Sequence, residues 1–479
     1  MEARMLGKLD KRGRLKLPRI DPPIRSPQER IADFREVSLE YEAGAAIQEA
    51  SRCIECKHPR CEKACPLHNA IRDWLILTAE GRFLEAAALS HATSNMPEIC
   101  GRICPQDRLC ERACILGVKQ QPVAIGAIER FINDYAFRAW GGIPIPLTAP
   151  PTGNRVAIVG AGPAGLACAE ELRKMGHTVT IFESHPRPGG LLRYGIPSFK
   201  LEKWVVQRRI DSLQRLGIEF RCQVRVGHDL SLQDLFEQGF HAVFLATGAQ
   251  KPKRPNLPGM ELGGIHDALP FLIRNNLDGE EVTAGAARDD LRGRNVAVLG
   301  GGDTAMDCVR TAVRLGAPKV VCIYRRDEEN MPGSRQEIKR AQEEGVEFLF
   351  LAMPVRFLGD AAGQVTTVEC LKLTLGEPDA CGRRSPLPIE GSHFEVEASV
   401  VILAFGFEAD PTVDTEGQPK VTPWGTYGVD ERQMTSWPGV FAGGDGVRGA
   451  DLLVTALKDG RDAARAIDRH LRGGDRRSA

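Results

Sequence analysis

The stretch Arg155-Val-Ala-Ile-Val-Gly160-Ala-Gly162-Pro-Ala-Gly165-Leu166 decides the fold of this chain. A short apolar run meets a Gly-x-Gly-x-x-Gly turn, and a helix-favouring run, 166–174, follows it. A second apolar run, 178–182, ends at Glu183. Strand, glycine turn, helix, strand and acid in this order indicate a dinucleotide-binding βαβ unit. An ordinary glycine turn in an α/β unit is the alternative, and both strands and the acid argue against it.

Each glycine of this fingerprint has a separate role. Gly160 permits the tight turn, and Gly165 lets helix and strand pack closely. Gly162 lets the backbone approach a pyrophosphate, whose charge is favoured at the N-terminus of a helix. Glu183 is placed to accept a hydrogen bond from a ribose hydroxyl.

A second fingerprint lies at 295–307, Asn-Val-Ala-Val-Leu-Gly-Gly-Gly-Asp-Thr-Ala-Met-Asp. Its second strand, 319–324, ends at Arg325 and Arg326 instead of an acid. Two guanidinium groups suit a 2′-phosphate, so this site is expected to prefer NADPH to NADH. A solvated basic strand end is the alternative. One acid-ended and one arginine-ended fingerprint predict one FAD site and one NADPH site.

Composition limits the class of protein. A chain of 479 residues is long enough for about two to four domains. Its 63 basic and 63 acidic residues cancel, which gives no electrostatic case for nucleic acid or an anionic membrane. No apolar run approaches the roughly 20 residues of a membrane span, and the N-terminus lacks the apolar core of a secretion signal. We therefore expect a cytoplasmic protein, whose fourteen cysteines indicate metal or redox chemistry.

Eight cysteines form two groups near the N-terminus. The first group is Cys53-x2-Cys56-x4-Cys61-x3-Cys65-Pro, and the second is Cys100-x3-Cys104-Pro-x4-Cys110-x3-Cys114. Short spacings that end in Cys-Pro are typical of bacterial ferredoxins, in which the fourth cysteine of a run ligates the other cluster. We expect two [4Fe–4S] clusters with interleaved ligands. Structural zinc is the main rival, since it also takes closely spaced cysteine pairs.

The rest of the chain predicts an α/β fold. Amphipathic runs at 70–77, 82–89 and 125–140 indicate a helical ferredoxin-like domain at 1–150, which ends in a Pro/Gly-rich stretch. Two Rossmann-like domains follow. The FAD domain comprises 151–285 and 406–479, and the NADPH domain, 286–405, is inserted in it. The first 45 residues show no chemistry and leave open a solvated tail or an arm that packs on a partner.

The candidate cofactor-binding residues lie at the fingerprints and strand ends. The first nucleotide domain contributes Gly160, Gly162, Pro163, Ala164, Gly165, Glu183, Gly190, Leu191, Arg193, Lys200, Thr247 and Gly248. The inserted domain contributes Gly300, Gly302, Asp303, Thr304, Ala305, Arg325, Arg326, Ala404, Phe405 and Gly406. The C-terminal part contributes Gly444, Asp445 and Thr455. Asp445 is suited to bind ribityl hydroxyls, and the helix after it can direct amides at the flavin.

With these motifs placed, the chain resembles the small (β) subunits of bacterial NADPH-dependent glutamate synthases over about residues 30–470. The resemblance is carried by 52–56 (Arg-Cys-Ile-Glu-Cys), 97–105, 159–165, 300–307, 324–335 and 441–445. The flavin part is also similar to adrenodoxin reductase-like enzymes. The iron–sulfur and flavin parts together are similar to dihydropyrimidine dehydrogenase and to the NADPH-binding subunit of electron-bifurcating transhydrogenases.

The resemblance implies a ligand set for each cluster. One cluster would use Cys53, Cys56, Cys61 and Cys114. The other would use Cys65, Cys104, Cys110 and a non-cysteine ligand, a glutamine in dihydropyrimidine dehydrogenase, whose position corresponds to Glu129 here. Counting cysteines alone selects Cys100 instead of Glu129, so the eighth ligand stays open.

The resemblance also implies an activity. NADPH would reduce FAD by hydride transfer, and the clusters would pass single electrons to a glutamate synthase large subunit, which makes glutamate from glutamine and 2-oxoglutarate. Because the cofactors carry this chemistry, we expect no catalytic side chain. A related NADPH:acceptor oxidoreductase with another partner is the alternative. A disulfide reductase is disfavoured, because the remaining cysteines are scattered. A scaffold with decayed nucleotide sites is disfavoured by the intact glycines.

Overall fold

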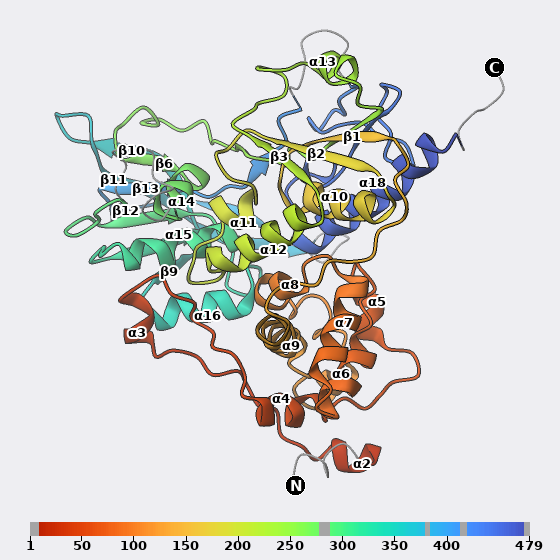
Figure 1. Ribbon diagram of the computed structural model, residues 1–479. Coiled ribbons are helices and arrows are strands. Elements are labelled where there is room, and N and C mark those ends of the chain that lie inside the picture. Colours follow the sequence, from red (N-terminus) through yellow and green to blue (C-terminus); the bar gives the residue numbers. More distant parts are fainter. Residues whose placement is uncertain (1–8, 277–287, 379–383, 412–418, 474–479) are drawn as a thin grey trace.

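The computed structural model describes residues 9–276, 288–378, 384–411 and 419–473. A helical unit and two parallel sheets with their helices form most of the described structure, and Figure 1 shows the helical unit below the sheets. This arrangement confirms the predicted fold class. The predicted boundary at 285/286 lies outside the described residues.

The helical unit contains both cysteine groups. Its helices are α4 (Ala43–Ala50), α5 (Arg60–Ala64), α6 (Ile71–Ala79), α7 (Phe83–Thr93), α8 (Pro97–Ile103), η1 (Ile115–Val118) and α9 (Ile125–Trp140). Proline at the first position of α8 needs no amide partner, and Gly141 ends α9 in the left-handed region at φ 68°. Trp74, Ile128 and Phe131 are buried where α6, α7 and α9 meet. The apolar faces of short helices thus form a core that holds the cysteine loops.

The first sheet has the order β15-β4-β1-β2-β3 and is parallel. Its strands are β1 (Arg155–Val159), β2 (Thr178–Glu183), β3 (Glu219–Cys222), β4 (Ala242–Leu245) and β15 (Val440–Ala442). Helices α10 (Pro163–Lys174) and α18 (Leu453–Leu471) cross so closely that a Cβ on Gly460 would lie 2.2 Å from the Ala164 carbonyl oxygen. Because β15 returns to this sheet, its two halves flank the second sheet in sequence.

The second parallel sheet has the order β6-β13-β7-β8-β9. Its strands are β6 (Ile265–Asp267), β7 (Val296–Leu299), β8 (Val320–Tyr324), β9 (Glu347–Phe350) and β13 (Val400–Leu403). Strand β6 precedes the predicted start of the inserted domain, yet it pairs with β13. Helices α14 (Ala268–Asn276), α15 (Asp303–Arg314) and α16 (Arg335–Glu343) accompany this sheet.

The remaining elements connect these units. An antiparallel sheet joins β10 (Ala352–Gly359), β11 (Val365–Pro378) and β12 (Arg384–Glu397), and β5 (Lys251–Pro252) pairs with β14 (Phe407–Glu408). The remaining helices of the described residues are α2 (Lys11–Arg14), α3 (Pro27–Ile31), α11 (Leu191–Tyr194), α12 (Lys203–Arg215), α13 (Leu232–Glu237) and α17 (Asp445–Arg448). In the described part of the chain, no helix combines the length and apolarity needed to cross a membrane.

Candidate nucleotide and cluster sites

A cavity of about 1000 Å³ opens at the carboxyl ends of β1, β2, β4 and β15. Parallel sheets bind ligands at this end of their strands. The cavity is lined by most of the candidates from the first nucleotide domain and its C-terminal part: Gly160, Gly162, Pro163, Ala164, Glu183, Gly190, Leu191, Thr247, Gly248, Gly444 and Asp445. Among the described residues, no cysteine lines it. Burial in this cavity raises the pKa of Asp445 to about 6.

Glu183 is held in place by backbone amides. One carboxylate oxygen accepts from the Ala161 amide at 2.8 Å, and the other accepts from the His185 amide at 2.8 Å. These two bonds fix the carboxylate between the glycine turn and the end of β2. Each oxygen retains lone pairs, so the group can still accept from a ligand.

The glycines of the first turn separate into two kinds. A Cβ on Gly160 would lie 2.4 Å from the Ala246 carbonyl oxygen, and its φ is 104°. A Cβ on Gly165 would lie 2.0 Å from the Gly160 carbonyl oxygen. The chain itself therefore requires these two glycines. Gly162 has an ordinary φ of −78°, and no protein atom lies within 4 Å of an added Cβ. The space beside it is open, as a pyrophosphate requires.

The second turn repeats this division. A Cβ on Gly300 would lie 2.3 Å from the Ala404 carbonyl oxygen, at a φ of 144°. Gly302, which precedes α15, has a φ of −86° and nothing within 4 Å of an added Cβ. Ala305 is fully buried in the helix. Both turns thus leave open space at the second glycine, and both fit a dinucleotide.

The two arginines after β8 have different surroundings. Arg325 is exposed, whereas Arg326 is buried and donates its Nε to the Arg384 carbonyl oxygen at 3.1 Å. Arg335 donates to the carbonyl oxygens of Glu328 and Glu329, which fixes the loop beyond the strand end. Arg325 is therefore the more accessible of the two predicted phosphate ligands.

A second cavity of about 680 Å³ lies where the helical unit and the two sheets meet. The helical unit contributes Cys104 to its lining, and the second fingerprint contributes Asp303 and Thr304. Leu452 and Leu453, before and at the start of α18, line both cavities. The first cavity, the second fingerprint and a cysteine group therefore adjoin one another.

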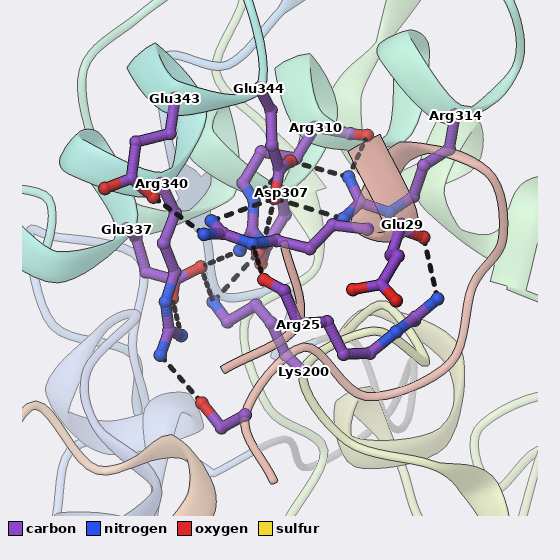
Figure 2. Close-up of polar contacts among 12 residues, drawn as sticks. Arg25, Glu29, Lys200, Asp307, Arg310, Arg314, Glu337, Arg340, Glu343 and Glu344 are labelled. Carbon is purple, nitrogen blue, oxygen red and sulfur yellow. Dashed lines mark hydrogen bonds and ion pairs between the residues drawn. The ribbon is translucent and has the colours of Figure 1, made fainter. Parts of the chain in front are cut away.

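Lys200 links the first nucleotide unit to two helices of the second, and it lines the second cavity instead of the first. Its Nζ lies 2.8 Å from Asp307 on α15 and 3.7 Å from Glu337 on α16. Arg310 is fully buried beside it and pairs with Glu337 at 2.5 Å and Glu344 at 2.8 Å. Burial raises the pKa of Asp307 to about 6, and the charge of Lys200 opposes the rise. Figure 2 shows these side chains converging from both parts of the chain.

The N-terminal arm reaches all three units. Arg30 on α3 pairs with Glu343 at 2.8 Å, and Arg340 donates to the Ser38 hydroxyl at 2.7 Å. Glu36 pairs with Arg102 and Arg130 of the helical unit, at 2.9 and 2.6 Å. The Val37 amide donates to the Phe199 carbonyl oxygen at 2.9 Å. The arm, red in Figure 1, is thus packed against the molecule and is not a solvated tail.

Four cysteines line one small cavity at the edge of the helical unit: Cys53, Cys56, Cys61 and Cys114. Burial raises the pKa of Cys53 to about 11 and of Cys61 to about 12. Since metals bind the thiolate, a bound cationic centre would offset this cost of ionisation. This grouping coincides with the ligand set that the resemblance implies.

The other cysteines gather around Glu129. Cys65, Cys104 and Cys110 each lie within electrostatic range of its carboxylate, and Cys100 lies beside Cys104. Glu129 accepts from Asn69 at 2.8 Å, and burial raises its pKa to about 8. Within the described residues, no three such side chains lie close enough to hold a single metal ion. Both candidates for the eighth ligand are therefore in this group.

Arg193, Ala404, Phe405, Gly406 and Thr455 line neither cavity. Arg193 is buried and donates to the Pro188 carbonyl oxygen and to Gln207. The Thr455 hydroxyl donates to the Leu452 carbonyl oxygen, and the Gly406 carbonyl oxygen accepts from the Lys253 amide. Ala404 approaches Gly300, and the side chain of Phe405 is 39% exposed.

Sequence reasoning did not find the contacts of the arm. Residues 25–36 carry many charges, but a charged run is also typical of a solvated tail. The glutamate that accepts from Arg30, Glu343, lies 313 residues away, so no local pattern indicates it.

Comparison with known proteins covers nearly the whole chain. Residues 30–140 match a family model described as dihydropyrimidine dehydrogenase domain II, 4Fe-4S cluster. Residues 154–460 match one described as pyridine nucleotide-disulphide oxidoreductase. The glutamate synthase (NADPH) small chain of Escherichia coli K12 is 47% identical over 462 residues, which are 94% of this chain and 97% of that protein.

Two further proteins are similar. The putative oxidoreductase AegA of Escherichia coli K12 is 47% identical over 456 residues, which are 93% of this chain and 69% of that protein. Among solved structures, Mycobacterium tuberculosis FprA in complex with NADPH has a TM-score of 0.57 at 22% identity, over 68% of this chain and 85% of that chain. This last similarity concerns the fold alone.

Proposed function

The chain belongs to the family of glutamate synthase (NADPH) small chains and is an NADPH-dependent oxidoreductase of the FAD and iron–sulfur type, and on this basis we propose that it is the electron-input subunit of a glutamate synthase. In this role it oxidises NADPH and delivers electrons to a large subunit. The large subunit makes glutamate from glutamine and 2-oxoglutarate.

One observation carries this proposal. The second cavity is lined at once by the second fingerprint, by Cys104 and by two leucines that also line the first cavity. The place for a pyridine nucleotide, the place for a flavin and a cysteine group therefore converge. Such convergence suits a chain that passes electrons from one centre to the next.

The residues of the first cavity would hold FAD. The open space at Gly162 and the N-terminus of α10 suit its pyrophosphate, and Glu183 suits a ribose hydroxyl. Asp445 and the N-terminus of α18 also line this cavity. We keep the predicted division, 151–285 and 406–479 for FAD and 286–405 for NADPH, as a proposal, although β6 and α14 of the first segment pack with the second sheet.

The residues of the second turn would hold NADPH. Gly302 and the N-terminus of α15 suit its pyrophosphate, and Arg325 suits the 2′-phosphate. When bound, the nicotinamide supplies a hydride, the flavin exchanges two electrons for single ones, and iron–sulfur centres carry single electrons. The protein's part is to bind and orient these groups, so we assign no acid or base.

The helical unit, within residues 1–150, would hold two [4Fe–4S] clusters. Cys53, Cys56, Cys61 and Cys114 would ligate the first, since they line one cavity. Cys65, Cys104 and Cys110 would ligate the second, with Glu129 as the fourth ligand and Cys100 as its competitor. Replacing each competitor singly, as Glu129→Ala and Cys100→Ser, and counting iron per chain distinguishes them. Only replacement of the true ligand is expected to lower the iron content and to alter the electron paramagnetic resonance signal of the reduced cluster.

Reconstitution with a large subunit tests the function. The purified chain and a glutamate synthase large subunit are combined under anaerobic conditions with glutamine, 2-oxoglutarate and NADPH. The proposal predicts a stable complex and NADPH-dependent glutamate formation, which neither subunit supports alone.

A second candidate is an NADPH oxidoreductase with a different acceptor. The equal identity to a putative oxidoreductase favours keeping it. NADPH oxidation by this chain with ferredoxin, but no complex with the large subunit, would select this candidate.

A further inference from the structure

A loop of the second cysteine group contacts the second fingerprint. The Arg108 guanidinium lies 2.9 Å from an Asp303 carboxylate oxygen, and it donates to the Pro332 carbonyl oxygen at 2.7 Å. Beside it, the Asp107 carboxylate accepts from the Arg335 amide at 3.3 Å. Arg108 lies four residues after Cys104, and its neighbour Asp107 lines the second cavity together with Asp303 and Thr304.

Asp303 occupies an unusual place for an anion beside a phosphate site. It is the first residue of α15 and directly follows Gly302. A carboxylate here favours the helix itself, because it opposes the positive end of the helix dipole. The same carboxylate repels a pyrophosphate bound at that helix end. A bound dinucleotide therefore requires the charge of Asp303 to be balanced.

The surrounding contacts provide this balance. One Asp303 oxygen accepts from the Ser334 amide at 2.8 Å, and the other faces Arg108. The side chains of Arg108 and Asp303 are each 39% exposed. Exposed ion pairs contribute little to folding stability, so this contact has its main effect on what binds beside it.

We infer that Arg108 is a positioning residue of the nucleotide site. Its cation neutralises Asp303 and holds the Pro332 loop against the turn, so that the N-terminus of α15 can accept a pyrophosphate. The nucleotide site is thus complete only when the helical unit is docked. This inference rests on the NADPH site proposed above.

The test measures binding of NADP⁺ to the oxidised, cofactor-loaded protein by the change in flavin absorbance. Arg108→Ala is expected to weaken binding about tenfold, because Asp303 then repels the pyrophosphate. Arg108→Lys keeps the charge and is expected to retain most of the affinity. Arg112→Ala is the matched control, since Arg112 is an exposed arginine of the same segment. FAD and iron contents are measured for every variant, and Arg108→Gln replaces Arg108→Ala if that variant loses iron.

A double variant tests the reason for the effect. In Asp303→Asn the repelling charge is absent, so adding Arg108→Ala to it is expected to cost less than twofold. Wild-type affinity in Arg108→Ala would overturn the inference. So would a tenfold loss on adding Arg108→Ala to Asp303→Asn, because Arg108 would then act without Asp303. Failure of the wild-type protein to bind NADP⁺ would instead overturn the proposed NADPH site, and this inference with it.

Discussion

Gly302→Ala is predicted to weaken nucleotide binding while it leaves the stability of the fold nearly unchanged. At φ −86° alanine is unstrained, and the added methyl group meets no protein atom within 4 Å. Because glycine is a better N-cap than alanine, we expect a loss of about 1 kcal/mol or less in the free energy of unfolding. The methyl group does enter the space assigned to the pyrophosphate. We expect NADP⁺ binding to weaken at least tenfold, about 1.4 kcal/mol.

The neighbouring Gly300→Ala is the matched control. There the methyl group would lie 2.3 Å from the Ala404 carbonyl oxygen, at a φ of 144° that alanine avoids. Strain and overpacking each cost about 1–3 kcal/mol, so this variant should lose about 2–6 kcal/mol of stability. The same glycine-to-alanine change is thus predicted to weaken nucleotide binding at position 302 and folding stability at position 300.

The assay combines urea unfolding with NADP⁺ titration for both variants. The reasoning is refuted if Gly302→Ala binds NADP⁺ as tightly as wild type, since the space beside Gly302 would then not hold the pyrophosphate. It is also refuted if Gly302→Ala destabilises the protein as much as Gly300→Ala does.

Three other predictions concern charged side chains. Arg310→Met should cost about 1.5–3 kcal/mol of unfolding free energy in urea, because it removes one charged partner from each of two buried glutamates, which keep Arg340 and Arg314. The exposed control Arg292→Ala should cost less than about 0.5 kcal/mol. Arg325→Ala should weaken binding of NADPH far more than of NADH in parallel titrations, and equal losses would contradict the 2′-phosphate assignment. Burial and the charge of Arg209 lower the pKa of His91 to about 3, so the folded protein keeps this ring neutral. Stability should fall as the pH drops below about 6.5, where the unfolded chain takes up the proton, and His91→Gln should reduce the difference in urea midpoint between pH 7.5 and 5.5. If His91→Gln leaves the difference in urea midpoint between pH 7.5 and 5.5 unchanged, His91 is not the cause of the pH dependence.

Local sequence patterns predicted most of the fold. The two glycine turns encode their βαβ units within about 30 residues, because strand, turn, helix and second strand follow one another directly in sequence. The cysteine spacings likewise indicated two groups, and the structure brings Cys114 to Cys53 through the packing of short helices. The sequence also predicted that one nucleotide domain is inserted in the other, and β15 does return to the first sheet after the strands of the second.

Side chains whose partners lie far away in sequence could not be placed from the sequence alone. Arg326 follows β8 as predicted, but its direction is set by Arg384, which belongs to a different sheet. Lys200 meets Asp307 across a junction of units, 107 residues apart. The N-terminal arm shows this limit most clearly. Its charged residues have partners in every unit, but its sequence pattern is the same as that of a solvated tail. Such side chains are placed by tertiary packing and not by spacing.

The central claim is that this chain takes electrons from NADPH and passes them through flavin to iron. Anaerobic addition of NADPH to the purified protein, followed in the visible spectrum and by electron paramagnetic resonance, tests it most directly. The account predicts bleaching of flavin bands and a signal from reduced iron–sulfur centres, in a protein that yields FAD and iron on denaturation. A protein that yields neither FAD nor iron, or whose spectrum is unchanged by NADPH, would contradict it.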